Sequence, residues 1–371
     1  MSRLVVTSAK RVVIKVGSST LTGSAGHELD ESAVAALVEI IAKLRKRGAE
    51  VVLVSSGAIA AGLAPLGLSV RPKDLATQQA VASVGQGRLI ASYNKAFALH
   101  EIIASQVLLT IDDVVRRSHY QNAQRTLFRL IQMGVVPIIN ENDTVGVSEI
   151  RFGDNDRLAA LVSHLIGADL LVLVTDIDGL YDAPPTRAGA TRISSVPDVS
   201  RLSDIEIGGV GSSGVGSGGM VTKVEAARIA TGAGVNALLT NLEELPEALA
   251  GADVGTIFAA HTDRKPSRLL WLAHAATPHG KLLLDSGATT AIKERGTSLL
   301  AAGVNGVEGE FIAGDTVELL SPTREVIARG LVAFDSDEIP AMLGKSTKQL
   351  AQELGPEFER ELVHRDDLVL L

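Results

Sequence analysis

Short apolar runs alternate with amphipathic stretches over the first half of the chain. The runs are rich in Val, Leu and Ile and occupy residues 12–16, 51–55, 135–139 and 170–174. Helical patterns such as Asp30–Arg47 and Arg117–Met133 lie between them. Continuous apolar strands that alternate with helices are typical of a mainly parallel sheet covered by helices on both faces. We therefore predict an α/β fold for this part of the chain.

Polar residues follow each of these predicted strands. They occupy Lys15–Ser19, Ser55–Gly57, Asn140–Asp143 and Thr175–Asp176, and a further acidic cluster is found at Gly153–Asp156. In parallel sheets, ligands bind outside the carboxyl ends of the strands. We predict that the four loops meet at one edge of the sheet and form a polar active site.

A glycine-rich segment, Gly208–Gly219, has seven glycines in twelve positions and leads into a predicted helix start at Met220. Backbone N–H groups at such a turn form a cradle for anions, and Lys223 adds a positive charge for a phosphoryl oxygen. A flexible linker is the alternative, but a linker does not normally end at a helix start that carries a lysine. The spacing does not match the P-loop pattern.

Several of these polar residues also have ordinary structural explanations when each is taken alone. Lys15 could be a strand-edge lysine, Ser56 could be a helix N-cap, and Asp and Asn are common in turns. Two clusters within about a dozen residues, with Asp143, Asn155 and Asp156 among them, are harder to explain as caps. They could bind an ammonium group or position magnesium.

The length of 371 residues favours two unequal domains. We predict a first domain over residues 1–265, a linker over 266–280 and a small β-rich domain over 281–371, in which Gly309–Leu320 resembles a hairpin of a small barrel. From Lys281 onward there are 9 Lys and Arg against 16 Asp and Glu, a net charge of −7 out of −8 for the whole chain.

Composition excludes several classes of site. The absence of cysteine rules out disulfides and thiolate chemistry and fits a cytosolic protein. Aromatic residues make up only 3% of the chain, which disfavours recognition by stacking. The segment Leu158–Val174 contains His164 and Asp169 and is too short and too polar to span a bilayer. We expect a cytoplasmic protein with no membrane partner.

Five motifs together resemble the glutamate 5-kinase family. They are Lys15–Ser18, Ser55–Gly62, Val136–Asp143, Phe152–Asp156, and Gly218–Met220 with Lys223. The resemblance covers nearly the whole chain and implies the amino acid kinase fold followed by a C-terminal PUA domain. The third and fourth motifs are the most specific to this family. Ser217 stands where the family commonly has threonine, and the hydroxyl is kept.

The resemblance implies phosphorylation of the γ-carboxylate of L-glutamate by ATP with Mg²⁺, the first step of proline biosynthesis. Glutamate would be held by Ser56, Gly57, Asp143 and Asn155. ATP would be held by Lys15, Thr175, Asp176, Ser217, Gly218, Gly219, Met220, Val221, Thr222 and Lys223. Lys15 and Lys223 would flank the transferred phosphoryl group, and Asp156 would orient them or bind magnesium through water. No residue is assigned as a direct metal ligand.

A glutamate side chain is already ionised at neutral pH, so attack on the γ-phosphate needs no general base. The reaction needs positive charge instead, because the glutamate carboxylate and the γ-phosphate repel each other. Lysines and magnesium supply this charge. A kinase for aspartate or N-acetylglutamate is the nearest rival. An RNA-binding protein that acts through the PUA-like domain is the alternative from another class, which the acidic charge opposes. The resemblance also implies feedback inhibition by proline. We expect a homo-oligomer because self-association is common in this fold, and a downstream glutamyl phosphate reductase as a partner because glutamyl phosphate is labile.

Overall fold

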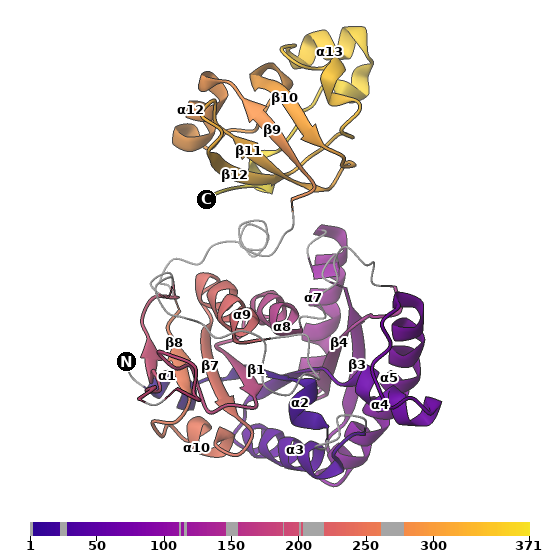
Figure 1. Cartoon of the computed structure of the whole chain (residues 1–371), viewed down its shortest axis with the longest axis vertical. Helices are drawn as coiled ribbons and strands as arrows, with labels where there is room; N and C mark the ends of the chain where they lie inside the picture. Colours follow the sequence, from indigo (N-terminus) through magenta and orange to yellow (C-terminus); the bar gives the residue numbers. More distant parts are fainter. Residues whose placement is uncertain are drawn as a thin grey trace. The chain divides into compact units, whose positions relative to one another are not determined.

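The structure is a computed structural model, and the chain divides into two compact units, Met1–Arg264 and Lys265–Leu371 (Figure 1). The structure describes residues 3–22, 28–110, 113–114, 117–145, 155–187, 189–199, 202, 219–260 and 278–371. Each unit has a sheet and a hydrophobic core of its own.

The N-terminal unit is built on an eight-stranded sheet with the order β3-β4-β2-β1-β5-β7-β8-β6. The strands are β1 (Arg11–Val16), β2 (Glu50–Ser55), β3 (Ala104–Leu109), β4 (Val136–Glu141), β5 (Leu170–Thr175), β6 (Ser195–Val196), β7 (Asn236–Asn241) and β8 (Thr256–Phe258). Neighbouring strands are parallel, apart from the antiparallel pair of β7 and β8. The prediction of a mainly parallel α/β sheet is confirmed.

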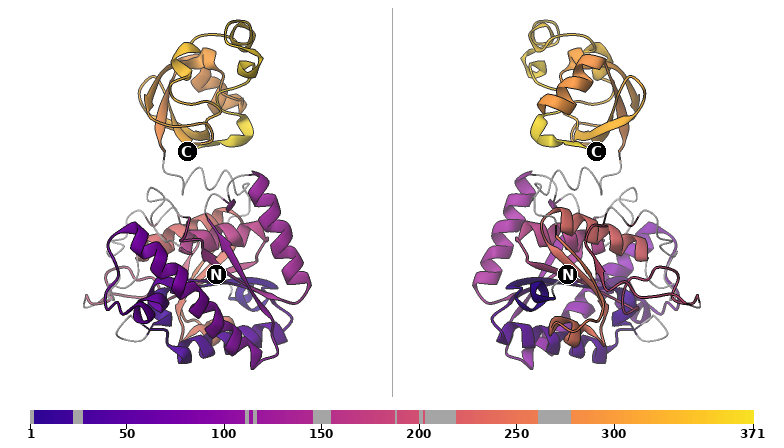
Figure 2. Two further views of the ribbon diagram at one scale, coloured as in Figure 1. Left: turned by 90° about the vertical axis from the view of Figure 1, so that its right-hand side faces the viewer. Right: turned by 90° about the vertical axis from the view of Figure 1, so that its left-hand side faces the viewer.

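Helices cover both faces of this sheet (Figures 1 and 2). They are α1 (Leu4–Thr7), α2 (Ser18–Leu21), α3 (Glu31–Lys46), α4 (Ala58–Leu63), α5 (Leu75–Ala98), α7 (Arg117–Gln132), α8 (Asn155–Leu165), α9 (Met220–Gly232) and α10 (Leu245–Leu249). In Figure 1, α8 and α9 lie above the sheet, and α3 and α10 lie below it. Among the described residues, no helix combines the length and the apolar character that crossing a bilayer requires.

The alternation along β1 decides which side chains face which helices. Val12, Ile14 and Val16 belong to the core cluster that also contains the buried residues of α3 and α10. Successive side chains of a strand point to opposite faces, so Val13 and Lys15 face the other side, where α8 contacts β1. The strand thus directs a lysine toward the beginning of α8.

Helices α4 and α5 approach each other closely at two glycines. A Cβ atom at Gly62 would overlap the backbone of Val81, and a Cβ atom at Gly85 would overlap the carbonyl of Ala58. Neither backbone can yield without moving a helix. This contact holds the first turn of α4 in place, directly after the end of β2.

We expect Gly85→Ala to lower the free energy of unfolding by about 1–3 kcal/mol, because the overlap forces the two helices apart. Gly87→Ala on the same helix is the matched control, since a Cβ atom there meets no atom within 4 Å. That change is expected to stabilise the protein by roughly 0.5–1 kcal/mol through helix propensity. Urea unfolding of both variants measures the difference, and equal stabilities would contradict the packing argument.

The C-terminal unit has a five-stranded sheet with the order β10-β9-β11-β12-β13. Its elements are β9 (Gly280–Leu284), α12 (Ser286–Arg295), β10 (Val304–Gly309), β11 (Thr316–Leu320), β12 (Val326–Leu331), α13 (Thr347–Glu353) and β13 (Leu368–Leu370). The core of this unit is formed mainly by Leu, Val and Ile, with Phe311 and Phe334 also buried in it.

The predicted hairpin over Gly309–Leu320 is wrong. Strand β10 ends at Gly309 and pairs with β9 in antiparallel orientation, whereas β11 pairs with β9 in parallel orientation on its other side. The hairpin partner of β11 is β12. The segment does contain a strand, β11, but a local sequence pattern carries no information about which strand lies beside it.

Candidate active site

Four neighbouring parallel strands, β4, β2, β1 and β5, end at the same edge of the sheet. Their carboxyl ends carry Asn140, Ser55, Lys15 and Thr175. The predicted convergence of the four polar loops is therefore confirmed. The edge combines two kinds of structure, a group of charged side chains and a network of amides and hydroxyls.

The charged group consists of Lys15, Asp156 and Lys223, from β1, α8 and α9. Lys15 Nζ lies 2.6 Å from Asp156 Oδ1, and Lys223 Nζ lies 3.3 Å from Asp156 Oδ2. The three residues are 5%, 0% and 7% exposed. Thr222 Oγ1 lies 3.0 Å from Asp156 Oδ2 and 2.8 Å from the carbonyl oxygen of Gly219, so it ties the helix start to the same carboxylate.

Burial by itself would raise the pKa of Asp156, but Lys15 and Lys223 outweigh it and lower this pKa to about 2. The carboxylate is therefore ionised at neutral pH. Two lysines around one carboxylate leave the group with a net charge of +1. A buried group of that charge at the edge of a sheet is suited to bind an anion.

The second structure is a network around Asn155, at the first residue of α8. Its Nδ2 donates to Ser56 Oγ at 2.9 Å and to Asn140 Oδ1 at 3.0 Å. The backbone N–H of Glu141 donates to Asn140 Oδ1 at 2.9 Å and lies 3.3 Å from Asn155 Oδ1. Asn140 at the end of β4 and Ser56 directly after β2 are thus joined to the start of α8.

The turn after β2 places Ser56 at the beginning of α4. Gly57 has φ +105°, a left-handed conformation that favours glycine, and it is the N-cap of α4. Ser55 is buried and its Oγ lies 2.9 Å from the hydroxyl of Tyr93 on α5, which is also buried. Burial raises the pKa of Tyr93. The phenol is therefore neutral and supports the turn as a hydrogen-bonding group.

Asp143 lies two residues beyond the end of β4 and is partly buried. Burial raises its pKa above the usual range for aspartate, and Arg71 offsets this only in part. A ligand ammonium group would stabilise such a carboxylate, because it would add to the partial compensation that Arg71 supplies.

Thr175 is the last residue of β5, on the other side of the site, and Asp176 follows it. Thr175 is buried and its Oγ1 donates to Asp176 Oδ1 at 2.9 Å, while Asp176 is exposed. The chain beyond them is fixed against β8. Thr256 Oγ1 accepts from the backbone N–H of Leu180 at 2.8 Å and donates to the carbonyl oxygen of Ile193 at 2.6 Å.

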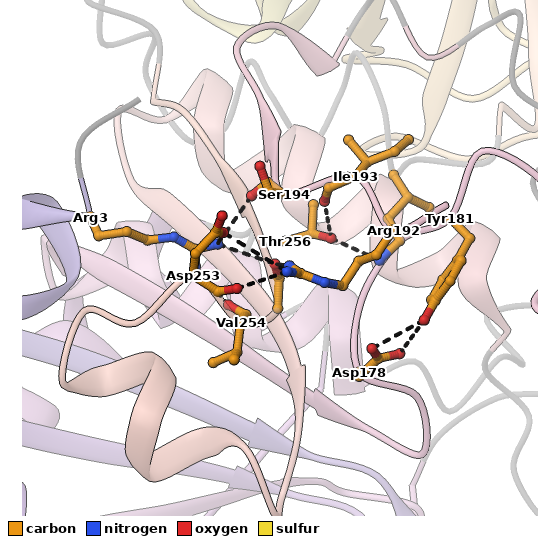
Figure 3. A network of polar contacts seen from close by, with 11 residues as sticks. Arg3, Asp178, Tyr181, Arg192, Ile193, Ser194, Asp253, Val254 and Thr256 are labelled. Carbon is orange, nitrogen blue, oxygen red and sulfur yellow. Dashed lines mark hydrogen bonds and ion pairs between the residues drawn. The ribbon is translucent and has the colours of Figure 1, made fainter. Parts of the chain in front are cut away.

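Two arginines reinforce this segment (Figure 3). Arg3 donates to Asp253 Oδ1 at 2.8 Å and to the carbonyl of Val254 at 2.8 Å. Arg192 donates to the carbonyl of Asp253 at 2.7 Å. These side chains therefore join the N-terminal residues, the segment after β5 and the beginning of β8.

Helix α9 begins at Met220, as predicted, with Gly219 as its N-cap. No side chain of the described residues caps its first turn, and backbone N–H groups at a helix start can bind an anion. Val221 is 54% exposed, whereas Lys223 points inward to Asp156. The predicted glycine loop lies outside the described residues up to Gly218, which includes Ser217, and so do Gly153 and Asp154.

In the part of the chain that the structure describes, no three His, Asp or Glu side chains lie together as metal ligands. Both carboxylate oxygens of Asp156 face lysines. The described carboxylates therefore offer no set of direct ligands for a magnesium ion.

Sequence reasoning missed two residues of α5 that support the site, Gln86 and Tyr93. Gln86 Oε1 accepts from Asn140 Nδ2 at 2.7 Å, and Tyr93 contacts Ser55. Neither residue belongs to a polar cluster in the sequence. One available signal was that a buried tyrosine hydroxyl usually needs a partner.

Comparison with known proteins gives a consistent result. The amino acid kinase family matches residues 10–241, and the PUA domain matches residues 280–354. A glutamate 5-kinase of Streptomyces coelicolor is 58% identical over 370 residues, covering 100% of this chain and 99% of the relative. A glutamate 5-kinase of Streptomyces avermitilis is 59% identical over 367 residues, covering 99% and 98%.

A solved structure adds support for the fold alone. A carbamate kinase from Giardia lamblia bound to AMP-PNP matches with a TM-score of 0.51 at 20% identity, covering 69% of this chain and 100% of that one. The family match spans most of the N-terminal unit, and the relatives are similar over the full length. The chain therefore belongs to the amino acid kinase family and, within it, to the glutamate 5-kinases that carry a C-terminal PUA domain.

Proposed function

We propose that this protein transfers the γ-phosphoryl group of ATP to the γ-carboxylate of L-glutamate, forming L-glutamyl 5-phosphate and ADP as the first step of proline biosynthesis. The observation that carries the proposal is the buried group of Lys15, Asp156 and Lys223, with its net positive charge, beside a network of amides and hydroxyls. The names of the full-length relatives support the choice of glutamate.

Glutamate would bind on the side of the site formed by β2, β4 and α8. The hydroxyl of Ser56 and the backbone at Gly57 would bind a carboxylate, and Asn155 would hold Ser56 in position. Asp143 would bind the α-ammonium group, which would supply the missing counter-charge. These four residues are the substrate-binding set of the proposal.

ATP would bind on the side formed by β5 and α9. Thr175 and Asp176 would contact the nucleotide, next to the segment that Arg192 joins to the beginning of β8. The start of α9, from Gly219 to Lys223, would bind the phosphates through backbone N–H groups, and the family motif adds Ser217 and Gly218 to this set. Lys15 would reach the phosphates from β1.

The chemistry follows from charge alone. An ionised γ-carboxylate oxygen attacks the γ-phosphorus, the bond from phosphorus to the bridging oxygen breaks, and ADP leaves with the electron pair. No proton moves, because the carboxylate is already ionised. Lys15 and Lys223 would stabilise the negative charge that the two anions bring together, and Asp156 would hold both ammonium groups in line.

Magnesium would enter this site bound to the phosphates of ATP, since Mg²⁺ is commonly held by substrate phosphates and water with few protein ligands. Its chemical contribution would be further neutralisation of the phosphate charge. Asp156 serves the lysines, so we propose no residue of this chain as a direct magnesium ligand.

The raised pKa of Asp143 leads to a pH prediction. Because its pKa is raised, Asp143 becomes protonated at a higher pH than an ordinary aspartate. We therefore expect the KM for glutamate to rise as the pH falls through the pKa of Asp143. A pH profile of KM measures this effect. Asp143→Asn is the control, because its KM should be high and should depend less on pH. Parallel profiles would contradict the role of Asp143.

The proposed function is tested by ATP turnover with hydroxylamine, which traps acyl phosphates as hydroxamates. L-glutamate, L-aspartate, N-acetyl-L-glutamate and no acceptor are compared at equal concentrations. Hydroxamate with glutamate alone is the expected result. Product with another acceptor would reassign the substrate-binding residues while keeping the kinase chemistry, and no product with any carboxylate would overturn the proposal.

A further inference from the structure

The amide network of the site has a fixed direction. The backbone N–H of Glu141 can only donate, and it lies 2.9 Å from Asn140 Oδ1 and 3.3 Å from Asn155 Oδ1. Both asparagines must therefore turn their oxygens toward it, and their NH₂ groups point away. This single backbone group decides the orientation of two amides that could otherwise be flipped.

These two amide orientations also decide which groups donate and which accept at both ends of the network. At one end, Asn155 Nδ2 donates to Ser56 Oγ, so the serine oxygen accepts and its own proton is left to donate. No described residue accepts that proton. At the other end, Asn140 Nδ2 donates to Gln86 Oε1 at 2.7 Å. The network therefore presents a hydroxyl donor at the substrate side, and it ends in an acceptor supplied by α5.

The acceptor at Gln86 is needed because Asn140 is only 2% exposed. If Gln86 Oε1 were removed, the buried NH₂ group of Asn140 would lose this hydrogen-bond acceptor, and a buried donor that loses its acceptor destabilises the folded protein. Rotation of the Asn140 amide by about 180° would remove its NH₂ group from this position. The same rotation would place that NH₂ group against the N–H donors of Glu141 and Asn155. Asn155 would then lose one of its acceptors and its hold on Ser56 would weaken.

We propose that Gln86 is a positioning residue for the substrate site, whose Oε1 fixes the direction of the amide network so that Ser56 presents its proton to a substrate carboxylate. The inference rests on the proposed function, since it takes glutamate as the ligand of Ser56. It assigns a role in substrate binding to α5, a helix that contributes no residue to the substrate-binding set.

The test is a double-mutant cycle of Gln86→Met and Ser56→Ala, because methionine keeps the length of glutamine but cannot accept the hydrogen bond. We expect Gln86→Met to raise the KM for glutamate roughly tenfold and to leave the KM for ATP unchanged. In the Ser56→Ala background the same substitution should add less than about twofold, because the hydroxyl through which Gln86 acts is gone. Gln106→Met, at an exposed glutamine of β3, is the matched control.

Two results would overturn the inference: an unchanged KM for glutamate in Gln86→Met, or equal effects of Gln86→Met in the presence and absence of the Ser56 hydroxyl. Thermal unfolding of each variant separates loss of binding from loss of folded protein, and calorimetric titration with glutamate replaces KM if turnover is too low. Wild-type hydroxamate formation is measured alongside. A wild type that is inactive with every carboxylate overturns the proposed function, whereas an active wild type with an unaffected variant overturns only the role of Gln86.

Discussion

Asp156→Asn is expected to reduce kcat by roughly 10²- to 10³-fold. The substitution keeps the shape of the side chain and removes the charge that holds Lys15 and Lys223 at 2.6 Å and 3.3 Å. The two ammonium groups then repel each other and move out of the line of transfer. Steady-state kinetics measure the loss, and a kcat within about threefold of wild type would contradict the proposed arrangement.

The same substitution should lower the free energy of unfolding by about 3–5 kcal/mol, the cost of removing one partner from a buried ion pair. Asp253→Asn is the matched control. The side chain of Asp253 is 71% exposed and pairs with Arg3 at the surface, so its loss should cost less than about 1 kcal/mol. ATP should raise the melting temperature of Asp156→Asn more than that of wild type, because the phosphates replace the missing negative charge.

The pH dependence of stability has a definite sign. The pKa of Asp156 is lowered from 3.8 to about 2 in the folded protein. Its contribution is therefore fully present above pH 3.8 and is lost as the pH falls toward 2. Wild type should lose more stability than Asp156→Asn over this interval, as measured by acid unfolding. Equal losses would show that the carboxylate is not stabilised by the lysines.

Lys15→Met and Lys223→Met are each expected to lower kcat by roughly 10²- to 10³-fold, with the KM for glutamate within about threefold of wild type. Each lysine supplies charge along the line of transfer, where negative charge must be neutralised. Neither belongs to the substrate-binding set, so the ground-state binding of glutamate should change little. The kinetics of both variants, measured with saturating ATP, check this.

Lys43→Met is the control for the loss of a lysine as such. The side chain of Lys43 is 67% exposed and pairs with Glu39 on the surface of α3, so the kcat of the Lys43→Met variant should equal that of wild type. Near-normal turnover in both Lys15→Met and Lys223→Met would end the proposed catalytic role. A large increase in the KM for glutamate, with kcat unchanged, would move the lysines to the substrate-binding set.

The sequence by itself determined the layers of the fold and the edge at which the site lies. Four apolar runs correspond to β1, β2, β4 and β5, and the polar residues that follow them meet at one edge, because parallel strands end on the same side of a sheet. The start of α9 at Met220 was also predicted. These features are encoded locally, since the period of apolar residues and the residue types at strand ends depend on near neighbours in the chain.

Only the tertiary structure decided which side chains meet. The pairing of Lys15 and Lys223 with Asp156 joins residues more than sixty positions apart, and it depends on the face of β1 that α8 covers. The support from Gln86 and Tyr93 comes from a helix with no polar cluster of its own. In the C-terminal unit, β9 separates β10 from β11, although their sequence resembled a hairpin. Local patterns specify the type of an element and its buried face, whereas its neighbours are chosen by packing between segments that are distant in the chain.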